Sequence, residues 1–149
     1  MKKVLGVLSL AFALIALAPA TANAGYGTRI GLKLLEMINT VEDDGGTIAC
    51  INADQLTSDE NIRTYTRHLY SGNEYTAVAM GDSRIADTDL VVYRRSGGSW
   101  EEVTRDADAS NTAECTFRCN RSGEYKFEVK AYRFEGSNTT GFYGFILSF

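Results

Sequence analysis

The sequence predicts a mainly β protein: an antiparallel β-sandwich, jelly-roll-like, with one or two N-terminal helices after a signal peptide. Three observations lead to this fold class. The chain opens with a short apolar stretch behind two lysines. Residues 28–41 then repeat apolar side chains at helical spacing, and from about residue 69 onward the apolar period changes to two. Glycine-containing turns separate the later apolar stretches, as they do between short strands.

The first residues follow the order of a bacterial signal peptide. Two lysines precede an almost wholly apolar stretch at residues 4–18, and ANA at 22–24 supplies small side chains where a signal peptidase inspects the chain. The apolar stretch is shorter than the roughly 20 residues of a spanning helix, and no basic cluster follows it. We therefore expect cleavage after Ala24 and a secreted or periplasmic mature chain, residues 25–149, without a transmembrane segment.

A helical N-terminal extension is expected at residues 25–64. Residues 28–41 form an amphipathic helix that the glycines of VEDDGG end. The apolar side chains that share one face of this helix are Ile30, Leu34, Ile38 and Val41. TIACI at 47–51 is short enough for a strand, and Thr57 or Ser58 fits the N-cap of one more short helix.

The remaining chain, residues 65–149, is expected to form the sandwich. In GEYKFEVKAY, the side chains of Tyr125, Phe127 and Val129 alternate with charged side chains, which predicts a half-buried strand. ECTFRC and GFYGFILSF alternate in the same way. EYTAVAM and DLVVY are shorter and more apolar, which favours central positions in a sheet. Short strands with regular turns and no intervening helix indicate an antiparallel sandwich or barrel.

The charge of the chain limits its partners. The formal net charge is −4, and loss of Lys2 and Lys3 with the signal peptide would bring the mature chain to about −6. An acidic surface repels phosphate groups, so nucleic acid and anionic membranes are not expected as partners. A protein or a polysaccharide outside the cytoplasm is the expected partner.

Three short motifs follow one another in a fixed order. They are DTDL at 87–90 after an acidic loop, CTF at 115–117, and GEY at 123–125 at the start of a strand. This order resembles the bacterial pre-peptidase C-terminal domain, a small β-sandwich appended to many secreted peptidases, over residues 65–149. The resemblance implies an accessory role: folding support, targeting or adhesion to substrate. Residues 25–64 carry no protease motif, so this would be a free-standing copy of the domain.

Asp82, Asp87 and Asp89 precede the strand DLVVY. Calcium takes six to eight oxygen ligands, so these carboxylates are a candidate calcium site, and calcium is the cofactor that the sequence suggests. The alternative is that they accept backbone N–H bonds and hold the loop entering the strand. The family resemblance implies a structural role for the Asp-x-Asp-Leu pair. Asp106 and Asp108 would close a calcium site in space, or else form a solvated turn.

The three cysteines, Cys50, Cys115 and Cys119, are disulfide candidates, because an exported chain meets an oxidising compartment. Their odd number allows one intramolecular disulfide. Cys115 and Cys119 would lie about 13 Å apart on one strand, beyond the roughly 7 Å that a disulfide spans between Cα atoms. Cys50 with either of them is the better pairing, and three buried thiols are the alternative. The family often pairs the CTF cysteine with one in the preceding loop, which has none here.

Three aromatic residues near turns are ligand-binding candidates. Trp100, Tyr132 and Phe134 do not fit the inward alternation of the strands, and exposed rings there could stack on a sugar or contact a protein. The alternative is that these rings fold over the end of the sandwich.

No catalytic motif is present, so an enzyme is not expected. His68 is the only histidine, and neither a G-x-S-x-G turn nor an H-E-x-x-H pair accompanies it. The expected function is an exported, non-catalytic module that binds a protein or polysaccharide or assists a secreted hydrolase. A protease inhibitor or chaperone-like partner protein is the alternative, and a small hydrolase using His68 is a third.

Overall fold

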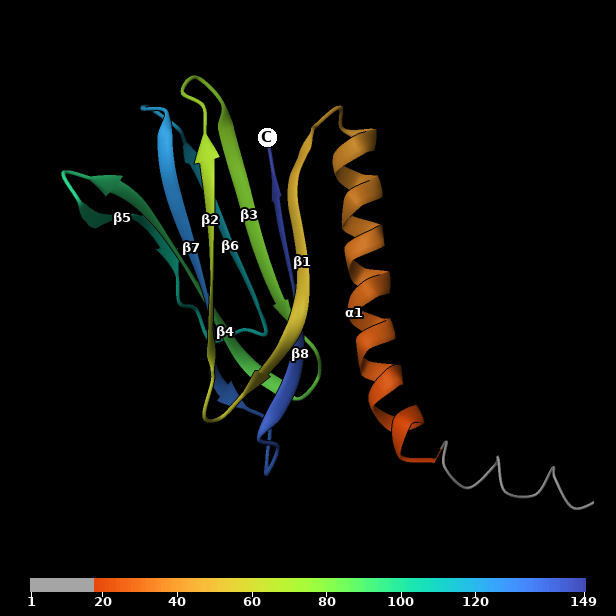
Figure 1. The fold of residues 1–149 in the computed structure, drawn as a ribbon. Coiled ribbons are helices and arrows are strands. Elements are labelled where there is room, and N and C mark those ends of the chain that lie inside the picture. Colours follow the sequence, from red (N-terminus) through yellow and green to blue (C-terminus); the bar gives the residue numbers. More distant parts are fainter. Residues whose placement is uncertain (1–17) are drawn as a thin grey trace, which may run out of the picture.

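The computed structural model describes residues 18–149. They form one helix and eight strands: α1 (Ala18–Asp43), β1 (Ile48–Thr57), β2 (Ile62–Leu69), β3 (Glu74–Gly81), β4 (Ile85–Ser96), β5 (Ser99–Asp106), β6 (Thr112–Arg118), β7 (Gly123–Phe134) and β8 (Thr140–Ser148). Two four-stranded sheets, ordered β1-β8-β3-β6 and β2-β7-β4-β5, are antiparallel throughout and face each other (Figure 1). The predicted antiparallel sandwich with an N-terminal helix is confirmed.

The strand order has the nested pairing of a jelly roll. β1 pairs with β8, β2 with β7, β3 with β6 and β4 with β5. Two further pairings, β3 with β8 and β4 with β7, join these pairs into the two sheets. The β4–β7 pairing places Asp87 opposite Arg133 and Asp89 opposite Lys130. It therefore brings the acidic motif of the sequence next to the end of β7.

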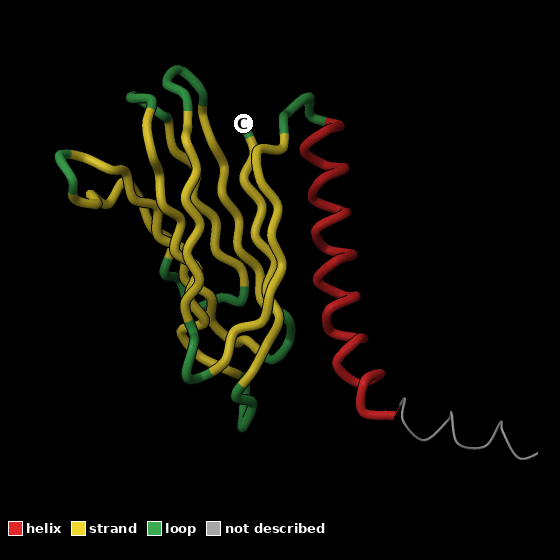
Figure 2. Tube along the Cα trace, in the orientation of Figure 1, coloured by secondary structure: helices red, strands yellow, loops and turns green. Residues whose placement is uncertain are grey.

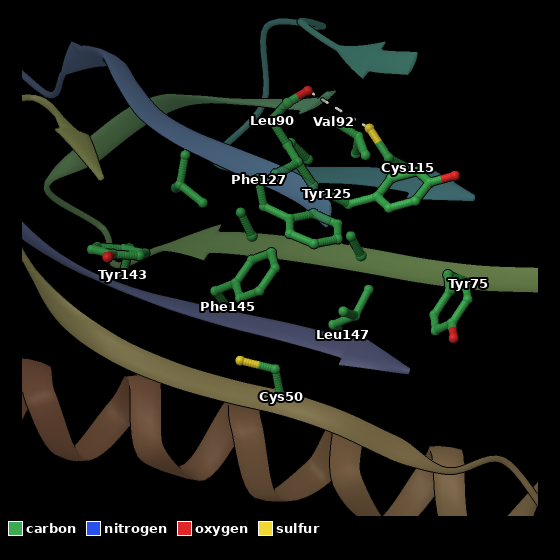
Figure 3. Packing of buried hydrophobic residues seen from close by; sticks show 14 of the residues in the cluster. Cys50, Tyr75, Leu90, Val92, Cys115, Tyr125, Phe127, Tyr143, Phe145 and Leu147 are labelled. Atoms are coloured by element: carbon green, nitrogen blue, oxygen red, sulfur yellow. Dashed lines mark hydrogen bonds between the residues drawn. The ribbon is translucent and has the colours of Figure 1, made fainter. Parts of the chain in front are cut away.

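The alternate side chains of the strands fill the space between the sheets. Tyr125, Phe127 and Val129 of β7 are at most 2% exposed, as their spacing predicts. The Phe127 ring contacts Phe117 of β6 and Phe145 of β8, at centroid distances of 6.4 and 5.5 Å. Figure 3 shows the Phe127 and Phe145 rings side by side. Each such buried side chain contributes about 1.5–3 kcal/mol to stability. These contacts hold the two sheets together.

Helix α1 covers the outer face of the β1-β8-β3-β6 sheet, which we call the covered sheet (Figures 1 and 2). Ile30 and Leu34, at most 5% exposed, pack on apolar side chains of β3 and β8. Gly144 of β8 permits this close approach, because a Cβ there would lie 3.0 Å from Leu34 Cγ. The helix ends at Asp43, and Gly45, with φ of +77°, turns the chain toward β1.

The predicted helical extension at residues 25–64 is wrong in its second half. β1 pairs with β8 and β2 pairs with β7, so both belong to the sandwich, and the predicted boundary at residue 65 falls inside β2. Thr57 caps no second helix; its Oγ1 accepts a hydrogen bond of 3.0 Å from the Glu60 N–H in the turn between β1 and β2. Two long-range strand pairings satisfy many backbone groups and override this local capping signal.

The predicted signal peptide, residues 1–24, lies largely outside the described residues, which begin at Ala18. The predicted cleavage position after Ala24 falls within α1. Among the described residues, no helix has the length and apolar character needed to cross a membrane.

Candidate ligand-binding face

The β2-β7-β4-β5 sheet turns its outer face away from α1, and none of the described elements covers it (Figures 1 and 2). On β4 the core residues Leu90 and Val92 alternate with Asp89, Val91 and Tyr93, so the latter point outward. We call this outer surface the open face. The side chains on it that matter below are those of Asp89, Tyr93, Trp100, Lys126, Lys130 and Tyr132.

At one end of the open face, cations lie over aromatic rings. The Lys126 Nζ is 4.2 Å from the ring centroid of Tyr93 and 5.4 Å from that of Trp100. The Arg95 guanidinium lies 5.8 Å from the Trp100 ring and forms an ion pair of 3.1 Å with Glu124. Exposed cation–π contacts contribute about 0.5–1 kcal/mol each and restrict the orientation of the rings. We call Tyr93, Trp100 and the Lys126 ammonium that lies near both rings the Trp100 platform.

The predicted ligand-binding aromatics divide between the open face and the core. Tyr132 is 63% exposed, and Lys130 Nζ lies 4.9 Å from its ring centroid. Tyr132 lies six positions after Lys126 on β7, which places it about 20 Å along the strand from the Trp100 platform. Phe134 is different, because its ring is partly buried against the main core. The structure therefore does not support Phe134 as a ligand-binding residue.

An open cavity of about 390 Å³ lies beside Tyr132. Its walls are Asp87 and Asp89 of β4, Ala107 and Ala109 of the β5–β6 connection, and Tyr132 itself. Asp87 is 7% exposed, and its buried Oδ1 has no hydrogen-bond partner among the described residues. Partial burial, and then the neighbouring Asp87 carboxylate, raise the pKa of Asp89 above its ordinary value, while Lys130 opposes that rise.

Asp82 does not join the other two aspartates in a metal site. Its carboxylate lies 2.6 Å from Arg84 Nη2, and it accepts hydrogen bonds from the backbone N–H groups of Arg84 and Phe142. No cluster of three or more acidic, histidine or cysteine side chains among the described residues is arranged to hold a metal ion. The Asp82 carboxylate is thus engaged by Arg84 and by backbone donors, as the loop-holding alternative expects, and calcium binding by the aspartates stays a prediction.

Asp106 shapes the loop that forms one wall of the cavity. Its carboxylate accepts hydrogen bonds from the backbone N–H groups of Asp108, at 3.0 Å, and Glu114, at 2.8 Å. Asp108 is exposed, as expected of a solvated turn. These contacts fit the alternative of a solvated turn for this pair.

All three cysteines are buried free thiols. Cys50, Leu147, Ala77 and Cys115 are successive partners across the covered sheet. Three strand spacings therefore separate Cys50 from Cys115, about 14 Å, and Figure 3 shows both at the margins of the core. A disulfide between them does not fit this sheet. Burial raises the pKa of the Cys115 thiol to about 11, which suppresses its reactivity.

His68 lies on β2, exposed, opposite Glu124 of β7. Its ring makes an edge contact with Tyr70 at 5.2 Å. The buried thiols belong to the core and not to the surroundings of His68, so the geometry gives no support to a site that pairs the histidine with a cysteine nucleophile.

A second hollow, of about 480 Å³, lies between the C-terminal half of α1 and the covered sheet. Met37, Val41, Glu74, Glu114 and Ile146 are among the residues that line it. No residue singled out from the sequence as a ligand or metal candidate lies there. This hollow exists because α1 packs mainly over β8 and β1 and leaves part of β3 and β6 uncovered.

The sequence analysis missed Tyr93, Lys126 and Arg95 as site residues. A signal was present for Tyr93 and Lys126, since both occupy outward positions of alternating strands. What could not be found without the structure is that β4, β5 and β7 are neighbours, which brings these side chains together with Trp100.

The sequence matches no family model and no curated protein. The structure is similar to solved β-sandwich proteins. One is the pre-peptidase C-terminal domain of a collagenase from Bacillus anthracis, with a TM-score of 0.53, 17% identity, and coverage of 66% of this chain and 87% of that chain. Another is a surface-associated copper-binding protein of Methylomicrobium album, with a TM-score of 0.50, 10% identity, and coverage of 65% and 91%.

A periplasmic inhibitor of g-type lysozyme from Aeromonas hydrophila aligns with a TM-score of 0.44, 16% identity, and coverage of 66% of this chain and 83% of that chain. At such identities the likeness concerns the fold alone. The comparisons therefore define the class of fold, an antiparallel β-sandwich. Within that class, the fold is that of the pre-peptidase C-terminal domain, as the motif order predicted.

Proposed function

We propose that this chain is an exported, non-catalytic binding module that holds an extracellular or periplasmic protein or polysaccharide on its open face. One observation carries the proposal. Helix α1 covers one sheet, whereas the other sheet presents Trp100, Tyr93 and Tyr132 with cations over their rings. Tyr132 is exposed and Trp100 and Tyr93 are half-buried, and aromatic side chains at a protein surface are a common mark of an interaction site.

The layout of these rings favours an extended ligand. The Trp100 platform and Tyr132 lie about 20 Å apart along β7. The surface between them carries charged side chains of β4, β5 and β7. A polymer chain or an extended peptide would contact both ends at once. Two contacts on one ligand strengthen binding by effective concentration, even when each contact alone is weak.

The sequence and the fold support the accessory part of the proposal. A leader of the signal-peptide type and a mature charge of about −6 suit a protein that works outside the cytoplasm. The fold is shared with a domain of a collagenase, which supports a role beside a separately encoded hydrolase. In that role the module would hold a substrate surface while the enzyme acts on it.

The test is retention of the purified protein on insoluble polysaccharides and on immobilised extracellular proteins, measured as depletion from solution. The double variant Trp100→Ala, Tyr132→Ala is expected to lose at least about tenfold in affinity, because it removes both aromatic anchors. Leu32→Ala is the matched control: this apolar side chain is 61% exposed but lies on α1, on the other side of the sandwich from the open face. Unchanged retention of the double variant would refute the proposal.

A further inference from the structure

The cavity beside Tyr132 contains an unexplained buried carboxylate. Asp87 is more than nine-tenths buried in its wall, and Oδ1 has no hydrogen-bond partner among the described residues. Burying an acceptor without a donor is unfavourable, and more so when the acceptor is charged. Such a group calls for a ligand that brings hydrogen-bond donors. Oδ1 itself has almost no solvent-accessible surface, so the carboxylate has to turn about its soft χ2 torsion to present this oxygen to a ligand in the cavity.

The charges around the cavity argue against a metal ion and for a neutral donor. Lys130 and Arg105 both interact with the Asp89 carboxylate and partly offset the charges of the pair. Calcium needs six to eight oxygen ligands, whereas the rest of this wall consists of two alanines and a tyrosine. A hydroxyl group needs only one acceptor, and two carboxylates side by side offer several.

The wall of the cavity also offers an apolar surface to a ligand. Tyr132 is 63% exposed, and the methyl side chains of Ala107 and Ala109 leave space in front of it. An exposed aromatic ring offers an apolar surface to a ligand with an apolar face. The ligand must therefore combine several hydroxyl donors on its edge with an apolar face, and carry no negative charge.

Building on the proposed function, we propose that this cavity is a sugar-binding subsite, in which hydroxyls of a neutral polysaccharide unit donate to Asp87 and Asp89 while the sugar ring stacks on Tyr132. The Trp100 platform then contacts the same polymer about 20 Å away along β7. Sugars that carry carboxylate or sulfate groups are repelled by the aspartate pair.

The test is calorimetric titration of the purified protein with soluble tetrasaccharides. The neutral probes are those of β1,4-linked glucose, β1,4-linked N-acetylglucosamine and α1,4-linked glucose, and the charged probe is that of α1,4-linked galacturonate. At least one neutral probe is expected to bind, and the galacturonate at least about tenfold more weakly. Asp87→Ala is expected to weaken binding about tenfold or more, and Tyr132→Ala about threefold to tenfold.

Two further variants keep the test decisive if Asp87→Ala unfolds. Ala109→Leu fills the cavity from an exposed loop position, keeps both carboxylates, and is expected to weaken binding about tenfold or more. Asp108→Ala removes an exposed carboxylate from the same loop and is expected to bind as the parent protein does.

Three results would overturn the inference. They are no binding of any neutral probe, equal or tighter binding of galacturonate, and binding that requires calcium and is abolished by a chelator. In each case the polymer-retention assay separates the two proposals. If Trp100→Ala with Tyr132→Ala still abolishes retention on a protein or polymer, the open face remains the binding face and only the sugar subsite is refuted.

Discussion

Asp82 and Arg84 form a buried ion pair at the start of β4, with 2.6 Å between Asp82 Oδ2 and Arg84 Nη2. The guanidinium also lies 4.0 Å from the ring centroid of Tyr26 in α1, and the Asp82 carboxylate accepts the backbone N–H of Phe142 in β8. A single charged pair thus connects the β3–β4 turn, the last strand and the helix. The most buried aspartate of the acidic motif serves the architecture and not the ligand.

Asp82→Ala is expected to destabilise the protein by about 3–5 kcal/mol, because it leaves the buried Arg84 guanidinium without its carboxylate. Thermal and denaturant unfolding measure this change. Asp59→Ala, at an exposed turn position, is the matched control and should stay within about 0.5 kcal/mol of the parent. An Asp82 variant as stable as the control would contradict the structural role of the pair.

Leu34→Ala and Leu35→Ala test the packing of α1 on the covered sheet. Leu34 is 5% exposed and contacts the apolar cluster, whereas Leu35 is 56% exposed on the same helix. Leu34→Ala should cost about 2–5 kcal/mol, and Leu35→Ala less than about 0.5 kcal/mol. Equal effects in urea unfolding would mean that the helix does not pack with this face inward.

The fold was largely predictable from local patterns. The alternation of Tyr125, Phe127 and Val129 identified β7, and the helical spacing of Ile30 and Leu34 identified the packed face of α1. β1 and β2 were harder, because the edge strands of this sandwich expose most of their side chains and show little alternation. Their strand conformation comes from pairing with β8 and β7, which no local pattern encodes.

The candidate site was predictable only in part. Trp100 and Tyr132 stood out because they break the inward alternation, and both lie on the open face. Phe134 broke it for another reason: it lies at the end of β7 and folds against the core. In the acidic motif, Asp82 pairs with Arg84, whereas Asp87 and Asp89 line the cavity. Local alternation could not predict this difference, because the pairing of β4 with β7 is irregular at Asp87.

Cys115 provides a pH-dependent test. Burial raises the pKa of its thiol to about 11, so the folded state favours the neutral form. Its contribution to stability is fully present below the ordinary thiol pKa of about 8.5–9 and is lost as the pH rises through about 11. At about pH 8, iodoacetamide should leave Cys115 unlabelled in the native protein and label it in denaturant. Native labelling, or a Cys50–Cys115 disulfide found by mass spectrometry, would contradict the structure.

Calcium is expected to have little effect on stability. A site with a Kd of about 10 μM would add about 2.7 kcal/mol at about 1 mM calcium, a shift of several degrees in the unfolding temperature. Arg84 forms an ion pair with Asp82, and the charges of Lys130 and Arg105 act on Asp89. We therefore expect calcium to change the unfolding temperature by less than about one degree relative to the chelator-treated protein. A larger shift that disappears in Asp89→Ala would restore the metal-site interpretation.

The most direct test of the open face as the binding face is an NMR titration that records backbone amide shifts as the tightest-binding neutral tetrasaccharide is added. We expect the largest shifts at Asp87 and Asp89 on β4, at the residues around Trp100 on β5, and along the stretch from Lys126 to Tyr132 on β7. Shifts centred instead on the hollow between α1 and the covered sheet, at Met37 and Glu74, would contradict it.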